Sequence, residues 1–426
     1  MTERQTGRTA QQTADVVILG AGPAGLTLGN LLRAAGIDCV VLERADPEHV
    51  RTRARAGFLA ANTVRVLDRH GLADGLHRHG KPHGTCEFRT EDGSFRLDYG
   101  ALGRRELHTV YPQQDLVTDL LTHYLAAGGR IAFETEAQAV EGIDGPAPTV
   151  TVRDAEGRPG HWRARYVAGC DGRHGAARRS LPPDTRRYHR DHGVSWLALL
   201  AEAPPSMDAV GYAMHPDGFA GHMARTADVT RYYLQCAPGT PADAWSEERI
   251  RTALDRRLRA DEHGPLHHGR ILHRSVVHLE SDVLDRLRYG SLLLAGDAAS
   301  LPAPAAAKGA NLAVLEAELL AEALIDELQR GDARALDGYS ARCLTHIWRA
   351  QEFAHWMIQL LHSPVGPGSG AAVGPVVGPA VGPAVGAQAG PAEESFFHEA
   401  MRRSRVESLR TSRTHQDWFA ENYVGI

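Results

Sequence analysis

Hydrophobic residues follow a strand–helix–strand pattern near the start of the chain. Residues 15–20 (DVVILG) form an apolar run that ends in glycine, residues 23–35 have helical spacing, and residues 37–43 form a second apolar run. Such a βαβ unit is typical of a parallel sheet in an α/β fold. Two helices and a further strand are predicted at residues 57–80, 114–127 and 163–172.

The pattern changes at about residue 185. From there to residue 290, short segments separated by turns predict antiparallel strands, which we expect to form a second region folded onto the first. Long amphipathic helices follow Gly309. Residues 363–391 repeat Val-Gly-Pro with hardly a charge, and this composition predicts a flexible insert, which we interpret as a tolerated surface expansion.

Composition excludes several classes of function. The formal charge of −5 over 426 residues is mild and includes no basic block, so neither nucleic acid nor an anionic membrane is expected as a partner. No apolar run approaches the roughly 20 residues of a membrane span, and the polar start lacks a signal peptide, so a cytoplasmic protein is expected. The five scattered cysteines predict reduced thiols, and no metal site is expected.

A glycine-rich turn follows the first strand. Gly20, Gly22 and Gly25 form GxGxxG at the start of the first helix, and Glu43 ends the second strand at the spacing of a ribose contact. The glycines permit a tight turn, a close approach of pyrophosphate and close helix–strand packing. The motif therefore predicts dinucleotide binding, and by itself it leaves NAD and FAD both open.

Several separated segments resemble one family in the same order along the chain. The resemblance covers nearly all of the sequence except the polar start and the Val-Gly-Pro insert. It is to the class A flavoprotein aromatic hydroxylases, specifically the 4-hydroxybenzoate 3-monooxygenase family. The matching segments are RTRARAG (51–57), TVYPQQ (109–114), VAGCDGRHG (167–175), RYYLQ (231–235), AKGANLA (307–313) and ENYVG (421–425).

The resemblance implies an α/β fold in which a Rossmann-like FAD-binding domain carries an inserted antiparallel β-sheet substrate domain and C-terminal helices. It implies FAD as cofactor, NADH or NADPH as electron donor, and O2 and a small aromatic acid as substrates. The expected divisions are residues 15–184 and 291–362 for FAD binding, 185–290 for the substrate sheet, 363–391 for the insert, and 392–426 for a C-terminal helix and active-site tail.

The same resemblance assigns the flavin contacts. Arg53, Arg55 and Gln113 are expected to contact FAD, and Asp171 of the CDG segment completes the site. Asp297 is expected at the ribityl chain. The backbone from Lys308 through Gly309 to Asn311 is expected beside the isoalloxazine ring, where the N-terminus of a helix faces its electron-accepting edge.

The substrate contacts also follow from the resemblance. Arg225 is expected to hold the substrate carboxylate with its planar fork, and Tyr233 to add a second contact. Tyr212, Tyr423 and His83 are expected to take the proton of the phenol to solvent, and His83 suits this role because imidazole titrates near neutrality. The carbonyl of Pro304 is expected to face the substrate hydroxyl.

The pocket wall departs from the family pattern. Met223 replaces a serine beside the carboxylate arginine, and Gly221, Ala303 and Ala305 are smaller than their family counterparts, whereas Phe58 is larger. These changes favour a ring-substituted relative of 4-hydroxybenzoate, such as 3-amino-4-hydroxybenzoate. Drift around an unchanged substrate is the open alternative, and the hydroxylated carbon is also open.

The nicotinamide side follows the family pattern in part. His174 and Arg178 match it, and Arg44, also among the expected cofactor contacts, is placed to face a 2′-phosphate. Glu280 replaces an arginine that helps to bind NADPH, and His49 replaces a tyrosine. Because a carboxylate repels a phosphate, Glu280 favours NADH, although both donors stay open.

Two other functions are compatible with a flavin fold. One is a halogenase or a reductase, which would not need a proton relay for a phenol. The other is a non-catalytic flavin protein that senses an aromatic acid, which would not consume NAD(P)H. Family likeness alone suggests a homodimer.

Overall fold

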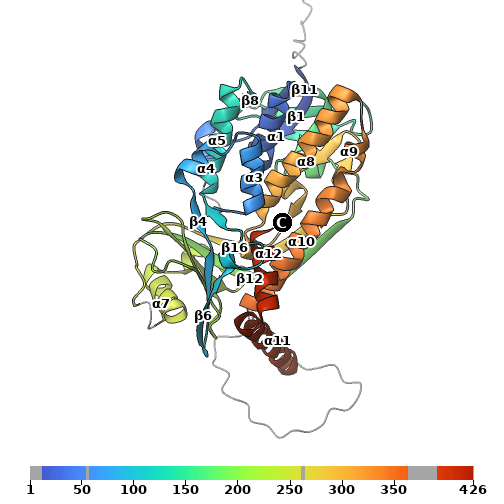
Figure 1. The fold of residues 1–426 in the computed structure, drawn as a ribbon. Helices are drawn as coiled ribbons and strands as arrows, with labels where there is room; N and C mark the ends of the chain where they lie inside the picture. Colours follow the sequence, from blue (N-terminus) through green and yellow to red (C-terminus); the bar gives the residue numbers. More distant parts are fainter. Residues whose placement is uncertain (1–11, 54–56, 261–263, 363–390, 426) are drawn as a thin grey trace, which may run out of the picture.

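The computed structural model describes residues 12–53, 57–260, 264–362 and 391–425, with the side chains of residues 391–395 excepted. Two eight-stranded sheets and one three-stranded sheet are covered by helices from both ends of the chain (Figure 1). Within these residues, no helix is both long enough and apolar enough to cross a membrane.

The first sheet has a parallel centre in the order β18-β11-β1-β2-β8. Val16 to Leu19 of β1 are fully buried, as expected for a central strand covered on both faces. The strands are β1 (Gln12–Leu19), β2 (Cys39–Leu42), β8 (Arg130–Ala132), β9 (Glu136–Glu141), β10 (Thr149–Arg153), β11 (Pro159–Gly169), β17 (Arg288–Tyr289) and β18 (Leu292–Leu294).

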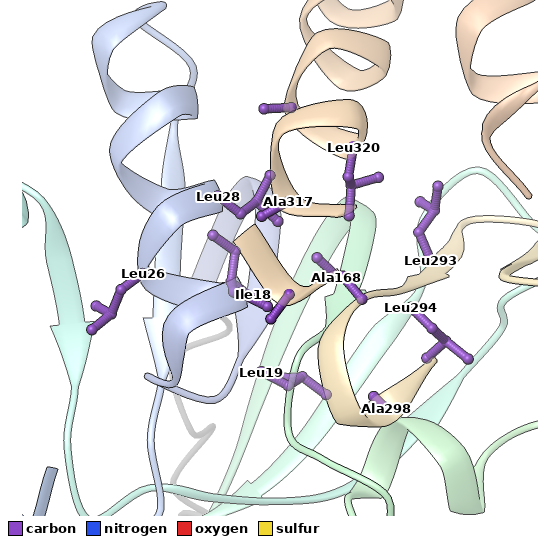
Figure 2. Packing of buried hydrophobic residues seen from close by; sticks show 14 of the residues in the cluster. Ile18, Leu19, Leu26, Leu28, Ala168, Leu293, Leu294, Ala298, Ala317 and Leu320 are labelled. Atoms are coloured by element: carbon purple, nitrogen blue, oxygen red, sulfur yellow. The ribbon is translucent and has the colours of Figure 1, made fainter. Parts of the chain in front are cut away.

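Two long helices from opposite ends of the sequence pack on this sheet. Helix α1 (Pro23–Ala34) lies beside α8 (Gly309–Arg330). Figure 2 shows Ile18 of β1 and Leu28 of α1 against Ala317 of α8, all of them buried. The remaining helices around this sheet are α2 (Pro47–Thr52), α3 (Ala61–Arg69), α4 (Asp74–His79), α5 (Gln113–Ala126), α6 (Ala176–Arg179) and α9 (Arg334–Asp337).

The second sheet has the order β19-β16-β12-β15-β14-β13-β5-β6. It extends beyond residues 185–290, the range predicted for it, because β5 pairs in parallel with the edge of β13. Its strands are β5 (Thr85–Thr90), β6 (Gly93–Asp98), β12 (Arg187–Glu202), β13 (Val210–Ala213), β14 (Ala220–Ala224), β15 (Thr230–Cys236), β16 (Arg270–Leu284) and β19 (Ser300–Leu301), and α7 (Glu247–Leu258) packs on it.

The predicted helix over 57–80 is wrong in part. Its first residues form β3 (Phe58–Leu59), which joins β7 (His108–Val110) and β4 (Lys81–His83) in the three-stranded sheet. Gly71 then takes a φ of +66° between α3 and α4, a conformation that ends a helix. Pairing of Phe58 with Val110, fifty residues away along the chain, outweighs the local helical pattern.

The C-terminal helices close the space between the two large sheets. Helix α10 (Tyr339–Leu361) packs against α8, and α11 (Pro391–Thr411) and α12 (Arg413–Val424) pack against α10 (Figure 1). A buried cluster joins residues of α10 and α12 to the second sheet and to the 3₁₀ turn η5 (Pro304–Ala306). Three further 3₁₀ turns are η1 (Tyr99–Ala101), η2 (Ala242–Ala244) and η4 (Gly296–Ala298).

Candidate active site

The glycine turn after β1 is shaped by close backbone contacts. Gly20 takes a φ of +95°, and a Cβ there would lie 2.6 Å from the carbonyl oxygen of Cys170. A Cβ on Gly25 would lie 2.0 Å from the carbonyl oxygen of Gly20, whereas one on Gly22 would meet open space. Two of the three glycines are therefore required by packing, and the middle one leaves its backbone accessible.

Glu43 anchors this turn. Its carboxylate accepts hydrogen bonds from the backbone N–H of Ala21 at 2.7 Å and of Ala45 at 2.8 Å. A carboxylate has about four acceptor positions, so the group retains capacity for a ribose hydroxyl. Arg44 is exposed next to it.

A second loop meets the glycine turn from the far end of the sequence. Gly296 takes a φ of +65° in η4, and a Cβ there would lie 3.2 Å from Cβ of Ala24 in α1. The backbone N–H of Gly296 donates to the buried Glu316 carboxyl of α8 at 2.6 Å. Asp297 follows Gly296 in this turn, and its contact with the ribityl chain of FAD stays a prediction.

These groups fit the dinucleotide part of FAD. The N-cap position of α1 has no side-chain hydrogen bond, and its first turn carries no acidic residue, so the amide end of the helix is open to an anion. Asp171 accepts from the N–H of Ala177 at 3.1 Å, while its Oδ1 atom is buried with no hydrogen-bond partner among the residues that the structure describes. Burial raises the pKa of this carboxyl, and a ligand hydroxyl would satisfy the free oxygen.

The segment that leads into α8 is held tightly. Ala307 takes a φ of +52°, a conformation that is uncommon for a residue other than glycine. The Asn311 side chain accepts from the N–H of Ala60 and the hydroxyl of Thr63 and donates to the carbonyls of Phe58 and Ala307, at 2.7–3.0 Å. All of its hydrogen-bonding capacity is used, so only the backbone here can meet a flavin.

Lys308 is buried and turned toward the C-terminal tail. Its ammonium nitrogen donates to the carbonyls of Asn422, Tyr423 and Gly425 at 2.6, 2.9 and 2.5 Å. Burial lowers the pKa of Lys308 to about 7, while three carbonyl acceptors match the three N–H bonds of an ammonium group. The side chain thus fixes the tail, and Gly309 follows as the first residue of α8.

Two of the other predicted FAD contacts lie at the ends of helices. Arg53 is the exposed C-cap residue of α2, and Gln113 is the first residue of α5. Arg55 lies outside the described residues. The contact of these three side chains with FAD stays a prediction.

The nicotinamide prediction meets a conflict at Arg178. Its guanidinium is 9% exposed, donates to the carbonyl of Ala298 at 2.7 Å, and pairs with Asp282 at 2.6 Å. These internal contacts leave it poorly placed to bind a dinucleotide. His174 is exposed, and Glu280 forms an ion pair with Arg173, so its charge is balanced within the protein.

One face of the second sheet collects the predicted substrate contacts. Tyr212 of β13, Gly221 of β14 and Tyr233 of β15 lie directly opposite one another in register. Met223 and Arg231 form the next row on that face, two residues along the strands. Side chains two residues apart share one face of a strand, about 7 Å apart.

Two arginines lie at the end of this face. Burial and the nearby charge of Arg231 lower the pKa of Arg225 to about 10, against smaller opposing effects of Tyr233 and Asp115. Arg225 donates to Oε1 of Gln114 at 3.3 Å, while the Nε atom of Arg231 is buried without a protein partner. Two partly desolvated cations of like charge favour an anion between them. The sequence analysis did not single out Arg231, although this residue begins the RYYLQ segment.

The predicted tyrosine pair is formed. The hydroxyl oxygens of Tyr212 and Tyr423 are 2.6 Å apart, and both side chains are buried. Burial raises the pKa of each phenol. His83 bonds instead to Tyr99, and His108 also faces Tyr99, so two residues that the sequence did not single out lie between the pair and His83.

The η5 turn forms the remaining wall. Ala303 and Ala305 are buried in the cluster that contains Tyr212 and Tyr423, and Met223 packs against that cluster. Pro304 is exposed, and its carbonyl accepts from the N–H of Ala307 at 3.1 Å. One lone pair of that carbonyl stays available to a ligand.

A dinucleotide turn joined to a separate sheet with a cationic, phenol-lined face is compatible with a flavin-dependent oxidoreductase. A family model described as an FAD binding domain matches residues 13–354. The chain is 32% identical over 412 residues to p-hydroxybenzoate hydroxylase of Acinetobacter baylyi. The aligned residues cover 96% of this chain and 95% of that protein. It therefore belongs to the class A flavoprotein aromatic hydroxylases, in the p-hydroxybenzoate hydroxylase family.

Two further similarities are informative. A 3-amino-4-hydroxybenzoate 2-monooxygenase of Streptomyces platensis is 29% identical over 387 residues, 83% of this chain and 89% of that protein. The structure of p-nitrophenol 4-monooxygenase from Pseudomonas putida has a TM-score of 0.76 at 20% identity and covers 97% of this chain and 99% of that one. The latter shows a shared fold.

Family membership confirms the predicted class of enzyme. The chain is an FAD-dependent aromatic-ring monooxygenase that uses NAD(P)H. A halogenase, a reductase and a non-catalytic sensor are thereby set aside.

Proposed function

We propose that this enzyme hydroxylates a 4-hydroxybenzoate-type acid, either 4-hydroxybenzoate itself or a ring-substituted relative such as 3-amino-4-hydroxybenzoate. The observation that carries the proposal is the distribution of groups on one sheet face. The hydroxyl pair of Tyr212 and Tyr423 and the guanidinium pair of Arg225 and Arg231 lie at different positions along this face. This separation suits an aromatic ring that carries a phenol at one end and a carboxylate at the other.

Arg225 and Arg231 bind the carboxylate in this proposal. A planar guanidinium offers parallel N–H bonds to a carboxylate, and partial burial strengthens the attraction. Tyr233 contributes its hydroxyl from the neighbouring strand. The carboxylate of the bound acid then offsets the repulsion between the charges of Arg225 and Arg231. Substrate binding therefore removes an unfavourable interaction.

Tyr212 and Tyr423 ionise the substrate phenol. Their short hydrogen bond lets Tyr212 accept the proton of the phenol while it donates its own to Tyr423, which releases its hydroxyl proton in turn toward solvent by way of His83. A phenolate is a more electron-rich ring than a phenol and is more readily attacked by an electrophilic oxygen. When bound beside this face, FAD would supply the redox chemistry by which electrons from NAD(P)H and one atom of O2 reach the ring, with water as the second product.

The walls of the site exclude water from that ring. Ala303, Ala305 and Met223 are apolar and lie in or against the buried cluster around the tyrosine pair. Small alanines beside the ring leave room for a substituent such as an amino group, which is supported by the similarity to the Streptomyces platensis enzyme. The carbon that is hydroxylated depends on how the ring is turned against these walls.

The electron donor is proposed to be NADH. Glu280 occupies the position where the family has an arginine that helps to bind NADPH. Its ion pair with Arg173 also engages the guanidinium of Arg173, which is then not available to a 2′-phosphate. The ratio of kcat/KM for NADH to that for NADPH tests this choice. A ratio above one supports it, and a ratio below one overturns it.

Product analysis tests the proposed reaction. The FAD-loaded enzyme is given NADH or NADPH with 4-hydroxybenzoate or 3-amino-4-hydroxybenzoate in separate reactions, and products are identified by mass spectrometry and NMR. A product heavier by one oxygen atom from either acid supports the proposal. Oxidation of the donor to yield only peroxide, with both acids, contradicts the proposed substrates.

A further inference from the structure

A second cavity lies between α10 and the paired strands β12 and β16. Its volume is about 260 Å³, and its lining includes Tyr188 and His192 of β12, Ser281 of β16, and Trp348 and His355 of α10. The rings of Tyr188 and Trp348 meet edge to face with their centroids 5.5 Å apart. These two residues are 50% and 45% exposed, so an aromatic pair forms the solvent side of the cavity.

The two strands separate this cavity from the predicted nicotinamide contacts. Ser281 lines the cavity, whereas Glu280 and Asp282 alternate with it along β16 and face the other side of the sheet. On that other side, Glu280 pairs with Arg173 and Asp282 pairs with Arg178. The cavity is therefore distinct from the side on which the electron donor is expected.

Gln351 brings an unused hydrogen-bond acceptor to the lining. Its Nε2 atom donates to the carbonyl of Leu301 at 3.0 Å, which fixes the other end of the amide as the oxygen. The residue is 6% exposed, and its Oε1 atom is buried with no hydrogen-bond partner within the described part of the chain. An N–H group of a ligand would satisfy this oxygen.

His355 brings an unused donor. Arg405 can only donate, and it bonds to Oε1 of Gln359 at 2.7 Å, so Nε2 of Gln359 is the donor to Nε2 of His355 at 2.9 Å. Burial and the charges of Arg190 and Arg405 lower the pKa of His355, so the ring is neutral and its one proton lies on Nδ1. Among the described residues, Nδ1 has no hydrogen-bond partner.

The charges of the lining favour an uncharged ligand. Burial and the neighbouring His355 lower the pKa of His192 to about 4, and this neutral ring lies 3.0 Å from the hydroxyl of Ser281. Arg190 and Glu352 are both exposed and carry opposite charges. A carboxylate would also be repelled by the free oxygen of the neighbouring amide, because neither group can donate a hydrogen bond to the other.

We propose that this cavity binds a small uncharged aromatic carboxamide. Tyr188 and Trp348 contact the ring, the amide N–H of the ligand donates to Oε1 of Gln351, and its carbonyl accepts from Nδ1 of His355. Gln351 and His355 are four residues apart on α10, where Cβ atoms are about 5–6 Å apart, a span that one amide group can bridge. This site is additional to the proposed substrate site and does not depend on the proposed function.

Benzamide is the probe, and calorimetric titration of the FAD-loaded enzyme measures its Kd. One molecule per chain should bind, with the same Kd in the presence and absence of 4-hydroxybenzoate. Acetophenone, which has a methyl group in place of the amide nitrogen, should bind about tenfold more weakly because it leaves the glutamine oxygen unpaired. Failure of benzamide to bind, its displacement by 4-hydroxybenzoate, or equal affinity for acetophenone overturns the proposal.

Two variants locate the bound probe. Trp348→Ala removes a half-exposed ring, and His355→Phe keeps a ring without its N–H, so each should raise the Kd of benzamide about tenfold. Phe396→Ala is the matched control, because Phe396 is 76% exposed on α11 and does not line the cavity, and it should leave the Kd unchanged. An unchanged Kd in Trp348→Ala and His355→Phe overturns the site, and product analysis with the aromatic acids tests the proposed function separately.

Discussion

Two side chains at the predicted site have a buried polar atom that a ligand could satisfy. The Nε atom of Arg231 and the Oδ1 atom of Asp171 are buried with no protein partner, one on the substrate face and one at the dinucleotide turn. Leaving a buried polar atom unpaired costs about 1–3 kcal/mol, so such positions are retained where a bound molecule repays the cost.

Replacement of Arg225 by Ala should weaken binding of the aromatic acid. Loss of a partly buried charge that faces a carboxylate costs about 2–3 kcal/mol, which is roughly a 30- to 150-fold rise in Kd. Titration of the flavin absorbance with 4-hydroxybenzoate measures the Kd. Arg158→Ala, which removes a largely exposed arginine, is the control, and equal affinities in both variants would contradict the anchor role.

Replacement of Tyr212 by Phe should uncouple oxidation of the donor from hydroxylation. The ring still packs, but the phenol loses its proton acceptor, and product formation should fall roughly 100-fold. The ratio of hydroxylated product to NAD(P)H consumed measures the effect, with peroxide as the balance. A ratio equal to that of wild-type enzyme would remove Tyr212 from the ionising step.

At the scale of elements, α8 ties the flavin loops to the rest of the fold. Glu316 of α8 holds the η4 turn through the N–H of Gly296, and Asn311 holds β3 and α3. Burial raises the pKa of Glu316 to about 8. The carboxyl is therefore neutral in the folded protein at pH values where it is ionised in the unfolded chain.

The variant Glu316→Gln should remove a pH-dependent loss of stability. Between pH 4.5 and about 8 the folded protein binds more protons at this position than the unfolded chain, so stability from this group falls as pH rises. Gln keeps a carbonyl acceptor for Gly296 without titrating. The Tm, measured at pH values from 5 to 8.5, should fall less steeply with rising pH in the variant than in the wild-type enzyme. Identical slopes would contradict the raised pKa of Glu316.

The elements that sequence patterns predict well are those defined by local spacing. The βαβ unit and GxGxxG turn are confirmed because apolar periodicity and glycine positions act within about thirty residues. The pairing of Phe58 with Val110, and of β5 with β13, could not be predicted because it depends on strands far apart in the sequence. The contacts of Tyr99 with His83 and His108 also join separate parts of the chain and could not be predicted from local spacing.

On the scale of the whole molecule, the active site is built where three parts of the chain meet. The first sheet supplies the glycine turn, the second sheet supplies the proposed substrate face, and α12 supplies Tyr423 (Figure 1). Lys308 links the first and the last of these parts. Movement of the C-terminal tail would therefore change both the flavin loop and the tyrosine pair.

A homodimer is the expected assembly, on family likeness alone. Light scattering coupled to size-exclusion chromatography should give a mass twice the 46.2 kDa of one chain. A mass of one chain, unchanged over a tenfold range of protein concentration, would contradict this expectation.

The central claim is that an acid bound by Arg225 and Arg231 is hydroxylated after ionisation at Tyr212 and Tyr423. The most direct test is identification of the product from 4-hydroxybenzoate and from 3-amino-4-hydroxybenzoate, each with NAD(P)H and O2. The account predicts a product one oxygen heavier from at least one acid, in proportion to the NAD(P)H consumed. Failure of both acids to stimulate NAD(P)H oxidation would contradict it.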